Sequence, residues 1–145
     1  MRRVLFASAV MLAAPAAVAD EAKMLCFELH DAGFNKEHGG SWMGVGFKPV
    51  DRYILRPATP AERQGELGLG GRATHVLADA KTPDAVHACA PAASGKTLRC
   101  YDGVEDFRMN IETRRFTVFY MYGYVDGEDD DKDTPSVALG LCAPE

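Results

Sequence analysis

The chain has 145 residues, of which 47% are hydrophobic and 26% are charged, and its net charge at pH 7 is −5. This hydrophobic fraction is typical of a folded domain and argues against intrinsic disorder. The excess of acidic residues argues against nucleic acid as the main partner, because phosphate binding needs a basic patch. It also argues against docking on an anionic membrane surface.

The first 19 residues have the pattern of an export signal. Arg2 and Arg3 supply a positive start, residues 4–14 form a short apolar run, and Ala17-Val18-Ala19 matches a cleavage site. The run is too short to cross the ~30 Å core of a bilayer. We therefore expect residues 1–19 to be a signal peptide and residues 20–145 to be one secreted domain, periplasmic or extracellular in a bacterium. Without Arg2 and Arg3 the domain carries 14 basic and 21 acidic residues, a net charge of −7.

An even number of cysteines remains in this domain: Cys26, Cys89, Cys100 and Cys142. In a small exported protein this count predicts two disulfides, for which three pairings are possible. A zinc site is not favoured, because no two cysteines have the C-x-x-C spacing.

Hairpin geometry selects one of these pairings. Residues 93–96 form a predicted turn, and a four-residue loop there would pair Ala92 with Thr97. Cys89 would then lie directly opposite Cys100, with Cβ atoms close enough for a disulfide. The other two cysteines would join the first and last strands. In the chain-entropy model so long a loop contributes about 4–5 kcal/mol.

Short β-prone runs recur along the chain with turn residues between them. The strands that we expect lie at residues 24–29, 41–47, 52–55, 74–77, 86–90, 97–100, 107–111, 116–124 and 136–142. Residues 58–64 are a predicted short helix, because Pro60 suits a first helical turn. Residues 30–40 are mostly polar and are predicted to be loop, and residues 65–71 contain four glycines and fit neither element. The expected fold class is all-β: one antiparallel barrel or sandwich of about seven or eight short strands, with one short helix and two disulfides.

The clearest alternating pattern lies in the last third of the chain. Phe107 and Met109 alternate with polar residues, and a short turn would place Met109 opposite Phe116 and Phe107 opposite Val118. These four side chains would share one face. The aromatic strand at residues 116–124 would also present side chains on its second face, which is either covered by the fold or an exposed patch for a partner.

The same region carries a resemblance. The residues that support it are Phe107-Arg108-Met109-Asn110, Thr113, Arg115-Phe116, Tyr120, Gly123-Tyr124, Asp133-Thr134-Pro135, Gly140 and Cys142. This pattern resembles one in small exported bacterial proteins of unknown function that have two disulfides. The resemblance covers the C-terminal third of the chain. It implies a secreted two-disulfide domain and brings no activity or catalytic residue with it.

A second resemblance rests on the turn Ser94-Gly95-Lys96-Thr97. It is similar to the Ser-Gly-x-x-Tyr turn with which small periplasmic lysozyme inhibitors enter the enzyme cleft, although Leu98 stands in place of Tyr. This similarity makes Ser94 and Lys96 candidate partner-binding residues. The turn also looks like the end of a phosphate-binding loop, but Ala90 stands at the required glycine, so we interpret it as a hairpin turn.

Residues 126–133 hold six carboxylates and one lysine. Closely spaced carboxylates can bind calcium, but this run lacks glycine and glutamate at the spacing of an EF-hand loop. Like charges this dense favour a hydrated loop that attracts a basic partner. Asp129, Asp130 and Asp131 are therefore candidate partner-binding residues, with weak cation binding as the alternative.

No catalytic constellation stands out in the sequence. The histidines have no metal-binding spacing, and no serine lies in a hydrolase motif. We therefore expect no catalytic residue, metal or cofactor. Our leading interpretation is a non-enzymatic periplasmic or secreted binding domain, a protein-binding or inhibitor-like module whose partner is a basic protein or a small ligand. Two alternatives stay open: a small-ligand-binding β-barrel, and a hydrolytic enzyme with no recognisable motif.

Overall fold

The structure is a computed structural model. It describes residues 23–36, 41–64, 71–121, 124 and 134–145, apart from the side chains of residues 85 and 86. These residues form nine strands and one short helix, which confirms the all-β fold class. In chain order the elements are β1 (Met24–Lys36), β2 (Trp42–Phe47), β3 (Arg52–Pro57), α1 (Pro60–Gln64), β4 (His75–Asp79), β5 (Thr82–Pro91), β6 (Thr97–Tyr101), β7 (Glu105–Asn110), β8 (Arg115–Tyr120) and β9 (Ser136–Pro144).

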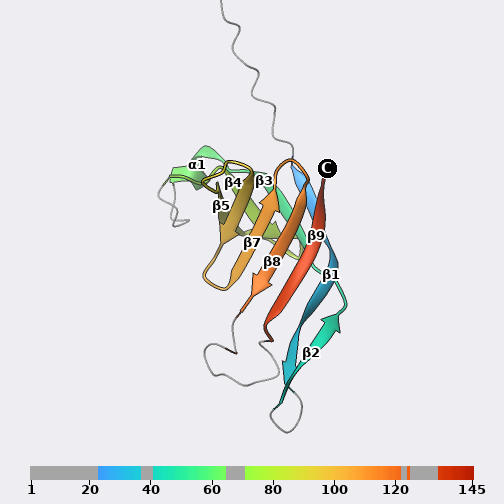
Figure 1. Cartoon of the computed structure of the whole chain (residues 1–145). Coiled ribbons are helices and arrows are strands. Elements are labelled where there is room, and N and C mark those ends of the chain that lie inside the picture. Colours follow the sequence, from blue (N-terminus) through green and yellow to red (C-terminus); the bar gives the residue numbers. More distant parts are fainter. Residues whose placement is uncertain (1–22, 37–40, 65–70, 122–123, 125–133) are drawn as a thin grey trace, which may run out of the picture.

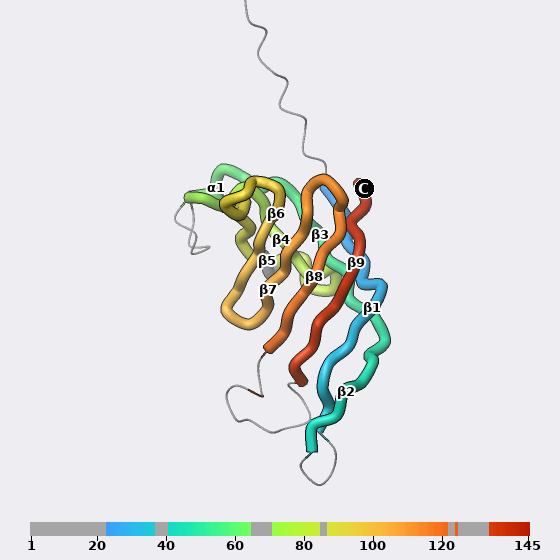
Figure 2. Tube along the Cα trace, viewed as in Figure 1, coloured from blue at the N-terminus to red at the C-terminus, as the bar shows by residue number. Residues whose placement is uncertain are grey.

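The strands form a closed antiparallel barrel (Figure 1). Consecutive strands from β3 to β9 pair with one another, and β1 closes the ring because it pairs with β3 on one side and with β9 on the other. β2 is an additional strand, attached to the second half of β1. Figure 2 shows the first and last strands side by side along the barrel wall. This closure decides between the barrel and the sandwich that the sequence left open.

β1 is longer than the sequence predicts. The prediction of a loop is wrong for residues 30–36, which continue the strand, while residues 37–40 lie outside the described residues. Tertiary pairing is the reason, since this polar half of β1 is held between β9 and β2. Gly33 serves packing here and not a turn, because a Cβ at this position would overlap the carbonyl oxygen of Pro135 and the ring of Phe47.

The predicted short helix is confirmed as α1, and its first turn explains why it forms. The Thr59 hydroxyl accepts a hydrogen bond from the Glu62 amide at 3.2 Å, and the Glu62 carboxylate accepts one from the Thr59 amide at 2.8 Å. This reciprocal pair is a capping box, and Pro60 follows the cap at the first helical position. Arg56 adds two hydrogen bonds to the same carboxylate, at 2.7 and 2.9 Å.

The interior of the barrel is filled by side chains. Phe107, Leu55, Leu98 and Met109 are each no more than 1% exposed. The rings of Phe107 and Phe116 stack with their centroids 4.9 Å apart. The ring of Tyr53, which is also buried, packs against both phenylalanine rings in a T-shaped arrangement. The predicted hairpin register is confirmed, because Met109 lies opposite Phe116 and Phe107 opposite Val118, and all four side chains are buried on the inner face.

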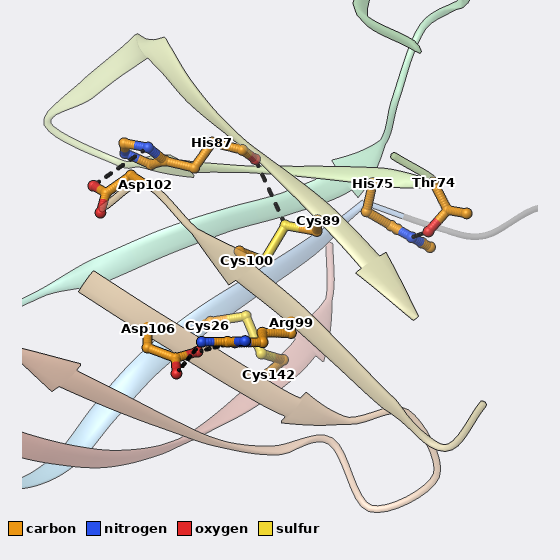
Figure 3. The surroundings of a disulfide bond; sticks show 10 residues. All are labelled: Cys26, Thr74, His75, His87, Cys89, Arg99, Cys100, Asp102, Asp106 and Cys142. Atoms are coloured by element: carbon orange, nitrogen blue, oxygen red, sulfur yellow. Dashed lines mark hydrogen bonds and ion pairs between the residues drawn. A yellow bond between two sulfur atoms is a disulfide. The ribbon is translucent and has the colours of Figure 1, made fainter. Parts of the chain in front are cut away.

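Both predicted disulfides are present, Cys26–Cys142 and Cys89–Cys100 (Figure 3). Each joins two residues that lie directly opposite each other on adjacent strands, with Cα atoms 3.9 and 4.1 Å apart. The hairpin arithmetic succeeded because the turn after β5 does hold a four-residue loop, in which the Ala92 amide donates to the Thr97 carbonyl at 2.7 Å. All four sulfur atoms belong to the core.

Residues 1–22 lie outside the described residues, so the signal peptide and its cleavage stay predictions. Within the part of the chain that the structure describes, no helix has the length and apolar character needed to cross a membrane.

Candidate functional site: the outer groove

The strands that fill the barrel interior also carry large apolar side chains on their outer face. A shallow groove of about 580 Å³ crosses this outer face from β1 over β9, β8 and β7 to the start of β6. We call it the outer groove and define it by six of its side chains: Leu29, Arg108, Arg115, Thr117, Leu139 and Leu141. This groove is the candidate functional site.

The strand register sets these side chains in two halves. Across the β8–β9 pair, Arg115 lies opposite Leu141 and Thr117 lies opposite Leu139. Across the β7–β8 pair, Arg108 lies opposite Thr117. Side chains of directly opposed residues share a face of the sheet. The groove therefore has an apolar half on β9 and β1 and a polar, cationic half on β8 and β7.

The apolar half consists of three leucines with large exposed fractions. Leu29, Leu139 and Leu141 are 49%, 48% and 43% exposed. Leu29 occupies the point where the β1–β9 register shifts, a bulge that adds one residue to β1. Gly140 lies between the two leucines of β9 and faces inward, where a Cβ would overlap the ring of Phe116. Core packing thus holds β9 in the register that turns Leu139 and Leu141 outward.

The cationic half carries a net positive charge. Arg99 and Arg108 share the carboxylate of Asp106, with hydrogen bonds of 2.7 and 2.8 Å from Arg99 and of 2.5 and 3.1 Å from Arg108. Partial burial acts to raise the pKa of Asp106, but these hydrogen bonds outweigh it and hold the pKa below its usual range. Arg108 also lies over the ring of Phe119, 5.6 Å from its centroid. Two cations against one anion leave a surplus positive charge.

Arg115 adds a second positive charge to the groove. Among the described residues its guanidinium has no ion pair, and its side chain lines the groove next to the leucines of β9. The outer groove is therefore basic on a chain whose net charge is −5. A ligand that fits both halves carries an acidic group beside apolar groups.

A second group of polar side chains, Glu28, Asp51 and Glu105, lies at the mouth of the barrel where β3 and β7 begin. The Tyr53 hydroxyl donates a hydrogen bond to the Glu28 carboxylate at 3.2 Å, and the Asp51 amide donates to the same group at 3.2 Å. Burial raises the pKa of Glu28 and, together with the nearby carboxylates, raises that of Tyr53. Burial also raises the pKa of Glu105, as do the negative charges around it, among them Asp51 and Glu28.

These mouth carboxylates do not assemble a metal site. Within the described residues, no group of three or more histidine, cysteine, aspartate or glutamate side chains is placed to hold a metal ion. Part of the negative charge is already neutralised, since the Lys81 ammonium pairs with Asp51 at 2.6 Å. The Nδ1 atom of His87 lies 3.5 Å from the Asp102 carboxylate (Figure 3). The described carboxylates at the mouth therefore repel one another and do not form a set of metal ligands.

Of the predicted partner-binding residues, the structure describes Ser94 and Lys96, and neither lines the outer groove. Ser94 and Lys96 are exposed on the turn between β5 and β6, where the Lys96 ammonium lies 3.5 Å from the Glu112 carboxylate. Leu98, at the position of the inhibitor tyrosine, points into the core and is 1% exposed, so it cannot reach a partner. Asp129, Asp130 and Asp131 lie outside the described residues. Ser94 and Lys96 therefore lie on one exposed turn, and the prediction for Asp129, Asp130 and Asp131 stays a prediction.

Sequence reasoning missed the outer groove, although a signal for it was present. In residues 136–142, Leu139 and Leu141 are an odd number of residues from Cys142, so their side chains lie on the opposite face of a strand. Cysteines are among the most often buried residues, so Cys142 is expected to point into the core. Leu139 and Leu141 are then expected to point outward. The exposed arginines offered no comparable signal, because charged residues on a strand are expected on any solvated face.

Comparison of the chain with models of protein families, with curated proteins and with solved structures found no match. The function of the chain is therefore inferred from the geometry of the site.

Proposed function

We propose that this chain is a non-enzymatic exported binding domain that holds a protein partner in the outer groove. The observation that carries the proposal is a contrast between the two sides of one barrel wall. The inner side chains fill the interior, while three leucines on the outer side stand almost half exposed in one row. Contiguous apolar surface of this kind on a small protein is typical of an interaction site.

The filled interior supports a binding surface on the outside over a ligand in the lumen. Barrels that carry small ligands need a cavity of roughly 300 Å³ or more between their walls. Here the aromatic and aliphatic core reaches from the disulfide Cys26–Cys142 across to Phe107 and Met109, with every one of these side chains at 5% exposure or less.

The charge of the groove indicates the chemistry of the partner segment. The partner segment carries acidic side chains that pair with Arg108 and Arg115, and apolar side chains that contact the leucines of β9. For the acidic residues 129–131 the sequence predicts a basic partner instead. That second prediction rests on residues outside the described part of the chain.

The two disulfides support an oxidising compartment as the place of action. Both are buried in the core and join adjacent strands, so they form part of the fold itself. Together with the predicted signal peptide, they favour a periplasmic or secreted location.

Affinity capture with three variants tests the proposal. Leu139→Asp and Arg115→Glu alter the apolar and the cationic half of the groove, and Val50→Asp is the matched control, since Val50 is 56% exposed and lies outside the groove. Each immobilised protein is incubated with an extract of the compartment to which the chain is exported, and bound proteins are identified by mass spectrometry. We expect one partner that the wild type and Val50→Asp retain and that both groove variants lose.

A titration with the partner's acidic segment as a synthetic peptide completes this test. Affinity should fall as salt rises from low concentration to 0.5 M, because the arginines are exposed and screened within about 10 Å. Retention that is equal for all four proteins would mean that the outer groove is not the binding site.

A further inference from the structure

β2 is the terminal strand of the sheet and, among the described residues, has a neighbouring strand on one side only. It pairs with β1 from Trp42 to Phe47, and none of its residues has a hydrogen bond that would occupy the other edge. Figure 1 shows β2 at the margin of the molecule, beyond the strands that close the barrel. A six-residue strand thus presents a row of unpaired backbone N–H and C=O groups.

The sequence of β2 lacks the features that normally protect such an edge. Its residues are Trp-Met-Gly-Val-Gly-Phe, without charge and without proline. The start of β5 makes a useful contrast, because its first residues extend beyond the three residues that pair with β6. There the chain places Pro83 and Asp84, which discourage pairing with another strand. The exposed edge of β5 is protected, and the edge of β2 is not.

The two glycines of β2 are not required by the isolated chain. A Cβ at Gly44 or Gly46 would meet nothing within 4 Å, and neither residue has a positive φ. Glycine weakens a strand interior, and one common reason for it is the close approach of another backbone. Both positions lie on the same face of β2, so this part of the face carries no side chain beside the free edge.

We propose that β2 pairs antiparallel with β2 of a second copy of this chain, about a two-fold axis that passes beside Val45. Residues that oppose each other across such a pair must face the same side of the sheet, so the axis has to lie at a residue and not between two. With the axis at Val45, Val45 faces its own copy, Met43 faces Phe47 and Gly44 faces Gly46. One side of the joined sheet then carries an uninterrupted apolar ladder, and the other carries paired glycines.

Charge favours a second copy as the occupant. A neutral strand can pair with itself without placing like charges opposite each other, which would be destabilising. The same register sets Lys48, the residue after β2, opposite Trp42 of the other copy, an arrangement that suits a cation–π contact. The net charge of −5 on each chain opposes association. Higher salt should therefore strengthen the dimer, whereas it weakens binding in the outer groove.

Cysteine cross-linking tests the register. In the proposed dimer the two Val45 Cα atoms lie ~4.5–5.5 Å apart, while the two Met43 Cα atoms are separated by about four residues of strand, ~13 Å or more. All four native cysteines are paired, so a new one supplies the single free thiol. We expect Val45→Cys to form a covalent dimer under mild oxidation and Met43→Cys, the matched control, to remain monomeric. Equal cross-linking of both variants, or none in either, would overturn the proposal.

Sedimentation equilibrium of the purified protein measures the association without any new cysteine. One short strand per copy makes a small interface, so we expect a dissociation constant on the order of 10⁻⁴ M. Met43→Asp should weaken it at least tenfold, and Val50→Asp, an equally polar change outside β2, should not. A wild-type protein that stays monomeric at millimolar concentration, or a Met43→Asp variant that associates as the wild type does, contradicts the proposal.

Discussion

Large apolar side chains lie on both faces of the wall formed by β7, β8 and β9, but only those on the inner face are buried. On the inner face Phe107, Met109 and Phe116 are at most 2% exposed. On the outer face, Leu139 and Leu141 of β9 remain 48% and 43% exposed. Hydrophobicity therefore does not decide which side of this wall is the core. The register of the strands, held by the disulfides and the aromatic stack, decides it.

The difference predicts that stability depends on the inner face and binding on the outer one. Burying apolar surface stabilises a fold by roughly 25 cal/mol per Å², so truncations inside the barrel should be costly. The outer leucines remain in contact with water in the folded protein, so they should contribute little to the free energy of unfolding. The following changes test this division, beginning with the largest expected effect.

Removing the disulfide between β1 and β9 should cost the most. Replacing Cys26 and Cys142 together by Ala opens a loop with a sequence separation of 116. The chain-entropy model gives a loss of about 5 kcal/mol for this loop, against about 3 kcal/mol for the 11-residue separation of Cys89 and Cys100. Urea unfolding of the two double variants measures the difference. A larger loss for the second pair would show that strain or local packing, and not loop length, governs both.

Truncation of the inner aromatic stack should come next. Phe107→Ala removes a ring that is 1% exposed and stacks on Phe116. We expect a loss of about 3–5 kcal/mol in the free energy of unfolding, from lost burial and the cavity that remains. Thermal or chemical unfolding followed by circular dichroism tests this. A loss below about 1 kcal/mol would contradict the filled-barrel description of the interior.

Removing a negative charge at the mouth of the barrel should raise the free energy of unfolding, whereas the two preceding changes lower it. The pKa values of Glu28 and Glu105 are raised in the folded protein, so between 4.5 and the raised values the folded state binds more protons than the unfolded state. Their contribution is present in full at low pH and is lost as pH rises through the folded pKa. Glu105→Gln should therefore stabilise the protein at pH 7, by about 0.5–1 kcal/mol.

Unfolding curves at several pH values separate this effect from a general one. Glu112→Gln, on a side chain that is 65% exposed, is the control and should change little. Glu62 has the opposite sign, because hydrogen bonds from Arg56 and from the cap lower its pKa to about 2. Its contribution should be lost as pH falls from 4.5 toward 2. A Glu105→Gln variant less stable than the wild type at pH 7 would mean that this carboxylate makes a favourable contact.

The smallest effect should come from the outer groove. Leu139→Ala should change the free energy of unfolding by no more than about 0.5 kcal/mol, as is usual for exposed positions, because this side chain is 48% exposed. Its melting temperature should match that of the wild type while binding of the partner is lost. Strong destabilisation would instead identify the row of leucines as part of the structural core.

Much of this fold follows from local sequence rules. The turn at residues 93–96 placed Cys89 opposite Cys100, and the alternation around Met109 placed it opposite Phe116, both as predicted. These predictions succeeded because a short hairpin fixes its own register. The helix after Thr59 was equally local, since its cap and Pro60 lie within one turn.

The second half of β1 and the outer groove could not be predicted in this way. Residues 30–36 are mostly polar and contain a glycine, and they form a strand because β9 pairs with residues 30–33 and β2 with residues 31–36. The groove joins Leu29 to Arg108 and Leu141 across strands that are far apart in the chain. Such a surface depends on how the barrel closes.

The all-β class, the disulfide pairing and the central hairpins could be predicted, because each depends on residues close in the chain or on simple elimination among four cysteines. Closure of the sheet through β1 and β9, the outward direction of the β9 leucines and, among the described residues, the free edge of β2 emerge only in the folded barrel. The physical reason is that closure is set by long-range strand pairing, in which packing against Gly33 and Gly140 selects one register among several that local alternation would allow.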